Sequence, residues 1–143
     1  MAAYNKFQDF SEQLALGVHK FDNSMVYKVA LTNTAPVATN TILANITQIS
    51  GTNGYTTGGT ATTIAESETT GTTTVTGTQV VFTAAGGTVG PFRYWVLYND
   101  TATSPADALV AWWDYGSAVT LNDGDSFTVK FSSASPGAIF TLA

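Results

Sequence analysis

The stretch GPFRYWVLYND, residues 90–100, decides the fold class because it indicates a β-strand that is apolar on both faces. Successive side chains of a strand point to opposite faces. One face would carry Phe92, Tyr94, Val96 and Tyr98, and the other Arg93, Trp95, Leu97 and Asn99. A sheet with one face in water alternates apolar with polar residues, and this stretch does not. We therefore expect a central strand with both faces covered.

A second stretch, LVAWWDY at residues 109–115, has the same double-sided pattern. Its faces would be Leu109, Ala111, Trp113 and Tyr115 on one side and Val110, Trp112 and Asp114 on the other. Burying one aromatic or leucine side chain is worth about 1.5–3 kcal/mol, a large share of the net stability of a domain. The opposite layer of a sandwich would cover one face. The second cover is either an N-terminal helix, which we expect first, or a neighbouring subunit.

The aromatic run has another interpretation, as a platform on which sugar rings stack. Trp95, Trp112 and Trp113 would then be exposed to solvent. Burial is the favoured interpretation, because the apolar residues occur on both faces rather than on one.

Arg93 is the single arginine of the chain and lies among these aromatic residues. A guanidinium on a buried strand needs a carboxylate or carbonyl oxygen as its partner. Asp114, on the neighbouring aromatic strand, is the candidate.

An amphipathic helix is predicted over residues 3–17. Apolar residues recur every three or four positions, at Tyr4, Phe7, Phe10, Leu14 and Val18. The face of Phe7, Phe10 and Leu14 must lie on the sheet. The candidate structural residues are therefore Phe7, Phe10, Leu14, Phe92, Arg93, Tyr94, Trp95, Trp112, Trp113 and Asp114.

After the helix the period changes to two, as in short strands bounded by turns. NDTATSPADA, residues 99–108, is predicted to be a polar loop, and LNDGDS, residues 121–126, a hairpin turn. Residues 39–49 fit one helical turn or a short buried strand. We predict a mainly β protein, a single domain over residues 1–143, in which the helix packs on an antiparallel β-sandwich formed by residues 25–143.

Residues 56–83 contain 13 threonines with glycines between them. Threonine is β-branched and favours strands, so exposed antiparallel strands and hairpins are expected here. The alternative is a disordered linker. Ile64, Val75 and Phe82 recur often enough to anchor a sheet.

No catalytic, metal or cofactor site is expected. The chain has one histidine, His19, expected at the end of the helix, and no cysteine, so zinc sites and nucleophile triads lack their components. Glu66 and Glu68 are expected on a solvated strand face rather than around a cleft. We predict that the protein is not an enzyme.

Charge and hydropathy exclude two classes of partner. Five basic residues against ten acidic ones leave no basic stripe for nucleic acid. No run of about 20 apolar residues could span a membrane, and the N-terminus lacks the pattern of a signal peptide. We expect synthesis in the cytoplasm.

Five stretches, taken in order, resemble a family of small structural proteins that tailed bacteriophages encode, usually near their head genes. They are YNKFQDFSEQLALGVHKF (4–21), YKVALTNTAPVATNTILANI (27–46), NGYTTGG (53–59), VVFTAAGGTVGPFRYWVLYNDTA (80–102) and LVAWWDYGSAVTLNDGDSFTVKF (109–131). The resemblance implies a capsid decoration or cement protein, a β-rich module bound to the major capsid protein on the exterior of the virion.

Members of this family are often homotrimers, so the resemblance also favours a trimer, and it implies no catalytic residues. Two alternatives stay open. One is a head or tail fibre module that binds host glycans. The other is a tail tube or completion protein, which would assemble into rings.

Overall fold

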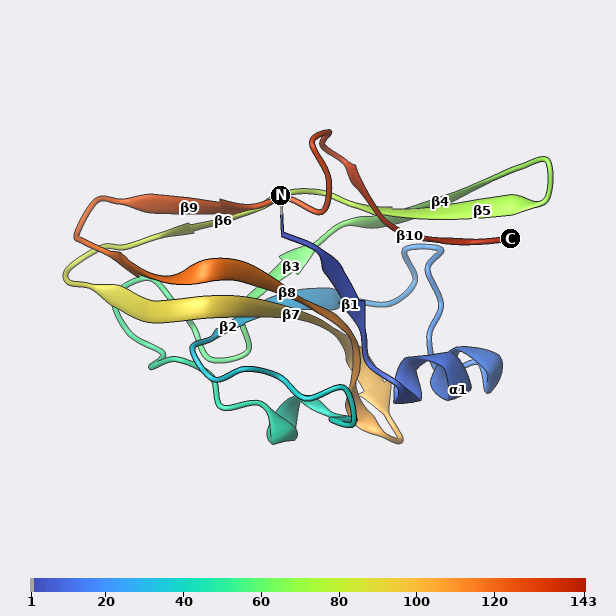
Figure 1. The fold of residues 1–143 in the computed structure, drawn as a ribbon, viewed down its shortest axis with the longest axis horizontal. Coiled ribbons are helices and arrows are strands. Elements are labelled where there is room, and N and C mark those ends of the chain that lie inside the picture. Colours follow the sequence, from blue (N-terminus) through green and yellow to red (C-terminus); the bar gives the residue numbers. More distant parts are fainter. Residues whose placement is uncertain (1) are drawn as a thin grey trace.

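Two layers of antiparallel strands face one another in the computed structural model, which describes residues 2–143 (Figure 1). The first layer is a five-stranded sheet, in the order β1 (Tyr4–Lys6), β8 (Ala106–Leu121), β7 (Val89–Thr103), β2 (Tyr27–Thr32) and β3 (Thr60–Thr62). The second layer is split. It consists of a three-stranded sheet, β10 (Gly137–Leu142), β5 (Thr72–Gly77) and β4 (Ile64–Thr69), and a two-stranded sheet, β6 (Val80–Thr83) and β9 (Ser126–Val129). The predicted mainly β fold with one helix near the N-terminus is confirmed.

The two aromatic stretches form the paired central strands β7 and β8, but bulges change which face some residues occupy. The register shifts between Phe92 and Tyr94, so Phe92 joins Trp95 and Leu97 in the core between the layers rather than Val96 and Tyr98. Strict alternation was therefore wrong for Phe92, because the pairing is irregular here, with residues 115–118 of β8 opposite Arg93 alone, and such irregularities change which face a residue occupies.

Leu109 differs from the expected pattern for the same reason. A second shift, where Leu97 pairs with Ala111 and Tyr98 with Leu109, separates Leu109 from Ala111 and Trp113. Leu109 packs on the outer face of the sheet, in the same cluster as Trp112.

Both faces of the central strands are covered, and the second cover combines Phe7, from the segment where the helix was predicted, with a loop that was not expected there. The outer face carries a cluster of Phe7, Ala30, Leu43, Ile46, Val96, Tyr98 and Leu109, with Trp112 at its border. Leu43 belongs to a short 3-10 helix, η1 (Leu43–Asn45), within the segment that follows β2. The loop thus folds back over its own sheet, and residues 39–49 form the helical turn rather than the strand.

The N-terminal helix α1 (Asp9–Ala15) is shorter than the predicted span of 3–17. Tyr4–Lys6 instead pairs with β8 as an edge strand, because Tyr4 then lies directly opposite Trp113 and packs against its ring. Phe7 then enters the outer cluster, and Phe10 packs against the end of the inner core. The ring centroids of Phe10 and Phe140 are 5.3 Å apart, and Leu14 lies half-buried nearby.

The threonine-rich segment is ordered, as predicted, and contributes strands to both layers. Its β4–β5 hairpin is exposed along β4, where only Ile64 is buried. Figure 1 shows this hairpin reaching out at one end of the second layer, and the turn after β8 at the opposite end.

Two predicted loops are different in the structure. Residues 99–108 are not a long polar loop, since β7 continues to Thr103 and β8 begins at Ala106. Asn99 is buried, and its side-chain oxygen accepts hydrogen bonds from the backbone N–H groups of Thr101 and Ala102, which shapes the strand end. The Asp123-Gly124 turn exists, but it joins β8 to β9 in the other layer instead of closing a hairpin.

Candidate functional site

The predicted pair of Arg93 and Asp114 is present as a two-point ion pair between β7 and β8. The Nε–Oδ1 distance is 2.8 Å and the Nη2–Oδ2 distance is 3.0 Å. The Arg93 guanidinium, followed by the Gly116 N–H, holds the pKa of Asp114 below its ordinary value. Both side chains are partly exposed, so the expectation of a buried pair was wrong. Arg93 also lies over the ring of Tyr94, at 5.5 Å.

The tryptophans occupy the core more than the surface. Trp95 and Trp113 are cross-strand neighbours with nearly parallel rings, 6.5 Å between centroids, and their exposed fractions are 3% and 1%. Trp112 is half-buried on the outer face, against Phe7 at 4.7 Å. This burial argues against a sugar-stacking platform made of the three tryptophans.

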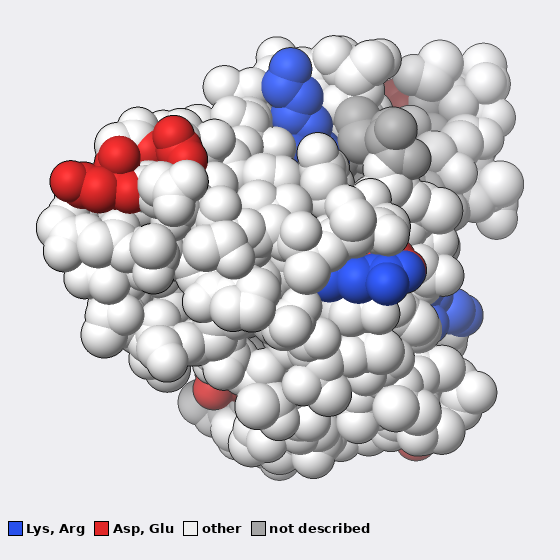
Figure 2. All heavy atoms as spheres, turned by 60° about the vertical axis from the view of Figure 1, so that its left-hand side comes forward, with Lys and Arg blue, Asp and Glu red and all other residues white. Residues whose placement is uncertain are grey.

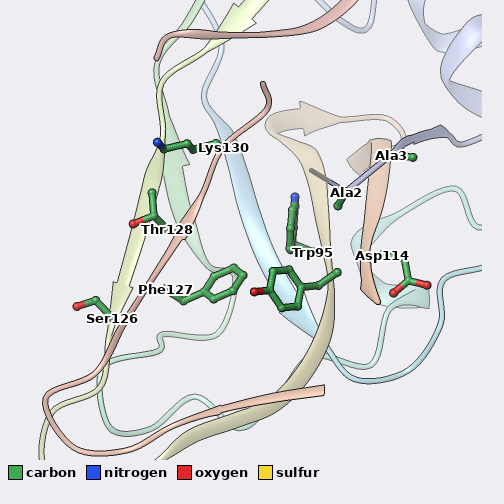
Figure 3. A pocket seen from close by; sticks show the side chains of 9 residues that line it. Ala2, Ala3, Trp95, Asp114, Ser126, Phe127, Thr128 and Lys130 are labelled. Atoms are coloured by element: carbon green, nitrogen blue, oxygen red, sulfur yellow. The ribbon is translucent and has the colours of Figure 1, made fainter. Parts of the chain in front are cut away.

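A cleft of about 540 Å³ opens between the edges of β8 and β9, at one side of the sandwich (Figure 3). Trp95, Tyr115 and Phe127 form its aromatic part, and centroid distances of 5.1–6.2 Å show that the three rings touch. The complete lining is Ala2, Ala3, Trp95, Asp114, Tyr115, Ser126, Phe127, Thr128 and Lys130. Polar groups stand around an aromatic floor, which is the usual composition of a binding site.

One polar atom of this cleft lacks a partner. The indole nitrogen Nε1 of Trp95 is buried, and no hydrogen-bond acceptor reaches it among residues 2–143. Figure 3 shows this nitrogen pointing into the space between the β9 side chains and Ala2. A buried N–H without an acceptor costs about 1–3 kcal/mol of stability, and an oxygen that accepts its hydrogen bond would remove this cost.

The groups with the most strongly shifted pKa values belong to the core rather than to the cleft. Burial raises the pKa of Tyr4 and of Tyr55 to about 12, and it raises the pKa of Tyr27 and of Tyr98 further. Burial also lowers the pKa of His19 to about 4. His19 was expected at the end of the helix, but α1 ends at Ala15, and His19 lies beyond it, buried against Phe10 and Phe21.

Acidic side chains are scattered. Glu66 and Glu68 lie exposed on β4, as predicted for a solvated face. Over the described part of the chain, no three His, Asp or Glu side chains converge in a way that could hold a metal ion. Figure 2 shows a face on which the charged groups are few and separated by wide uncharged areas.

Comparisons with protein-family models, with curated proteins and with solved structures find no match to this chain. The phage structural family therefore stays a prediction from the resembling stretches. In residues 2–143, neither helix is long and apolar enough to cross a membrane.

Of the candidate residues, the structure brings only Trp95 and Asp114 into the cleft. The candidate residues chosen from the sequence do not include Tyr115, Phe127 and Lys130, which also line the cleft. Phe127 alternates with polar neighbours in SFTVKF, which indicates that it faces a core. Which strand lies opposite depends on the pairing of β9 with β6, and no local signal carries that information.

Proposed function

We propose that this protein is a non-enzymatic structural component of a tailed-phage virion, which binds the exterior of the major capsid lattice as a decoration or cement protein. The five resembling stretches support the family. The observation that carries a binding role is the aromatic cleft beside the edge of β9, where the described part of the chain supplies neither a second partner strand nor an acceptor for the Trp95 N–H.

The electrostatics of the cleft favour binding over catalysis. Its one carboxylate, Asp114, is held ionised by Arg93 and has a lowered pKa. A general acid or base works best with a pKa near the working pH, and a carboxyl group that loses its proton this easily is a poor match. Tyr115 is exposed at this cleft and can contact another molecule.

A cement protein stabilises a head because it binds the assembled lattice and not the separated subunits. Binding to one state alone shifts the equilibrium toward that state by mass action. The projecting β4–β5 hairpin, exposed from Ala65 to Gly71, gives the molecule a second surface for contact with a neighbouring subunit. Self-association, with a trimer as the favoured state, would multiply these contacts.

The test is cryo-electron microscopy of virions from the phage that encodes this chain, with and without its gene. We expect density outside the capsid lattice in the first case and its loss in the second. Heads that lack the protein should release DNA at lower temperature and lower salt stress. Unchanged head density and unchanged resistance would contradict the proposal, and density on the tail would favour the tail component instead.

The oligomeric state needs a separate measurement. Light scattering of the purified protein should give the mass of a trimer, whereas a ring-forming tail protein would give a larger assembly. Binding to glycans on an array would support the fibre module and count against the cement proposal.

A further inference from the structure

Strand β9 has an unpaired edge. Within residues 2–143 it pairs with β6 alone, and the two strands form a separate sheet within the second layer. An unpaired edge presents a row of free N–H and C=O groups, which is a template for another strand.

The register identifies which groups of β9 are free. The Ala84 N–H donates to the Asp125 carbonyl over 2.9 Å, which makes these two a hydrogen-bonded pair at the start of the ladder. Bonded and non-bonded pairs alternate in an antiparallel ladder, so Phe127 and Val129 direct their backbone groups to β6. Thr128, which lies opposite Val81, directs its N–H and C=O away from β6, toward the free edge.

The same edge borders the aromatic cleft. Ser126, Thr128 and Lys130 line it from β9, while Trp95 and Tyr115 line it from the first layer. A strand added to β9 would therefore place one of its side chains over the aromatic rings. The Trp95 N–H is buried in the free protein, so side chains around it must move apart before an oxygen of the added strand can accept its hydrogen bond.

The positive charge of Lys130 favours an acidic side chain on the molecule that binds at this edge. Lys130 is exposed, and the ion pairs found within residues 2–143 are Lys28 with Asp100 and Arg93 with Asp114. No carboxylate of the described chain therefore neutralises Lys130, although the chain as a whole is acidic. An acidic residue on the incoming strand would form an ion pair with Lys130.

We propose that β9 and the Trp95 cleft receive an extended segment of a partner polypeptide, which adds to the edge at Thr128, inserts an apolar side chain over Trp95, and sets an acidic side chain beside Lys130. Strand addition of this kind takes affinity from main-chain hydrogen bonds and specificity from the side-chain pocket. The inference deepens the proposed function, since it names the surface that would hold a capsid subunit, but the peptide-binding site can be tested without the virion.

The test begins with a display library of random linear peptides, selected on the full-length protein. Enriched peptides should share an apolar residue with a nearby Asp or Glu. In a two-dimensional NMR spectrum, a synthetic copy should shift the indole N–H signal of Trp95 more than that of Trp112.

Two pairs of variants locate the site. Thr128→Pro removes an N–H that points to the free edge, and Val81→Pro makes the same change on the opposite edge of the two-stranded sheet. Trp95→Phe removes the indole N–H, and Trp112→Phe does so on the outer face. We expect each of Thr128→Pro and Trp95→Phe to weaken binding by about three- to tenfold, the worth of one hydrogen bond, and neither control to change it.

Lys130→Glu is a variant that should fold like the wild type, because the Lys130 side chain is exposed. It therefore tests the site without the risk of misfolding. Selection on this variant should enrich basic in place of acidic residues. The absence of enriched peptides, or equal binding to Thr128→Pro, Trp95→Phe and the wild type, would overturn the inference. An oligomer that Thr128→Pro dissociates would also overturn it, because the edge would then hold a second copy of this chain.

The two proposals can fail separately. If peptides bind at Trp95 but virions lack the protein, the cement function fails and the peptide site stands. If Thr128→Pro and Trp95→Phe still decorate heads as the wild type does, the site fails and the cement function stands.

Discussion

Arg93 on β7 and Asp114 on β8 join the two central strands through a pair of parallel hydrogen bonds, at a partly exposed position beside the aromatic cleft. Exposed ion pairs contribute little to stability, because water and salt screen them. We expect Asp114→Asn to lower the melting temperature only slightly at neutral pH. The lowered pKa of Asp114 means that its contribution is present above the ordinary pKa of an aspartate and is lost as the pH falls through the lower folded value.

Thermal melts of the wild type and Asp114→Asn at several pH values check this. The two curves should converge only at pH values below the lowered pKa of Asp114, where this carboxyl group is protonated in both the folded and the unfolded chain. A large loss at neutral pH would show that the pair holds the bulge between Phe92 and Tyr94 in place.

His19 should make the stability of the protein depend on mild acid. Its pKa falls from 6.5 in the unfolded chain to about 4 in the folded protein, because burial disfavours the charged ring. The stabilisation is therefore complete above pH 6.5 and is lost as the pH falls toward 4. A shift of this size corresponds to at most about 3 kcal/mol.

The measurement is chemical denaturation at a series of pH values between neutrality and this lower pKa. His19→Phe keeps an aromatic ring beside Phe10 and Phe21 and removes the titration, so its free energy of unfolding should fall less with acid. Parallel curves for the two proteins would show that other groups cause the acid sensitivity.

The outer cluster should matter as much as the inner core. Phe7 is fully buried on the outer face, although it lies just before the helix. We expect Phe7→Ala to cost about 3–5 kcal/mol, as for a buried phenylalanine. Leu16→Ala, at a residue that is 68% exposed, should change stability by less than about 0.5 kcal/mol. Equal effects in urea denaturation would mean that the loop around η1 does not hold Phe7.

Two glycines with the same backbone conformation should respond differently to alanine. Gly59 has a φ of 78° and Gly71 a φ of 83°, both in the left-handed region. A side chain at Gly59 would overlap the carbonyl oxygen of Val29, whereas the space around Gly71 is open. We expect Gly71→Ala to cost about 1–2 kcal/mol, the backbone term alone.

Gly59→Ala should cost clearly more than Gly71→Ala, because β3 would have to move away from β2 as well. The difference in the free energy of unfolding isolates the steric effect. If the two variants are equally stable, the segment before β3 adapts without loss.

The sequence allows the central strands to be predicted, because residues 90–100 and 109–115 are apolar on both faces and such strands are stable only between two covering layers. The partner of Arg93 follows from charge and proximity alone. The alternation of apolar and polar residues in one strand does not give the position of a bulge, because a bulge depends on how that strand pairs with its neighbour. This is why Phe92 and Leu109 were placed on the wrong faces.

The cleft and the outer cover depend on contacts between distant parts of the chain. Leu43 and Ile46 cover the sheet only because their loop folds back, and a short apolar pattern does not encode that direction. Tyr4 follows helical spacing yet lies in a strand, because pairing with Trp113 outweighs a weak local preference. Trp95 and Phe127 meet through the second layer, whose strand order no local pattern reveals.

The contact of Phe10 with Phe140 joins the beginning and the end of the described chain. During synthesis Phe10 leaves the ribosome long before Phe140, and β1 emerges long before its partner β8. Phe10 and the residues of β1 must therefore wait, unpaired, until the chain has been made as far as Phe140. Folding through such distant contacts is slow. We expect the nascent chain to need protection from aggregation until β10 has left the ribosome.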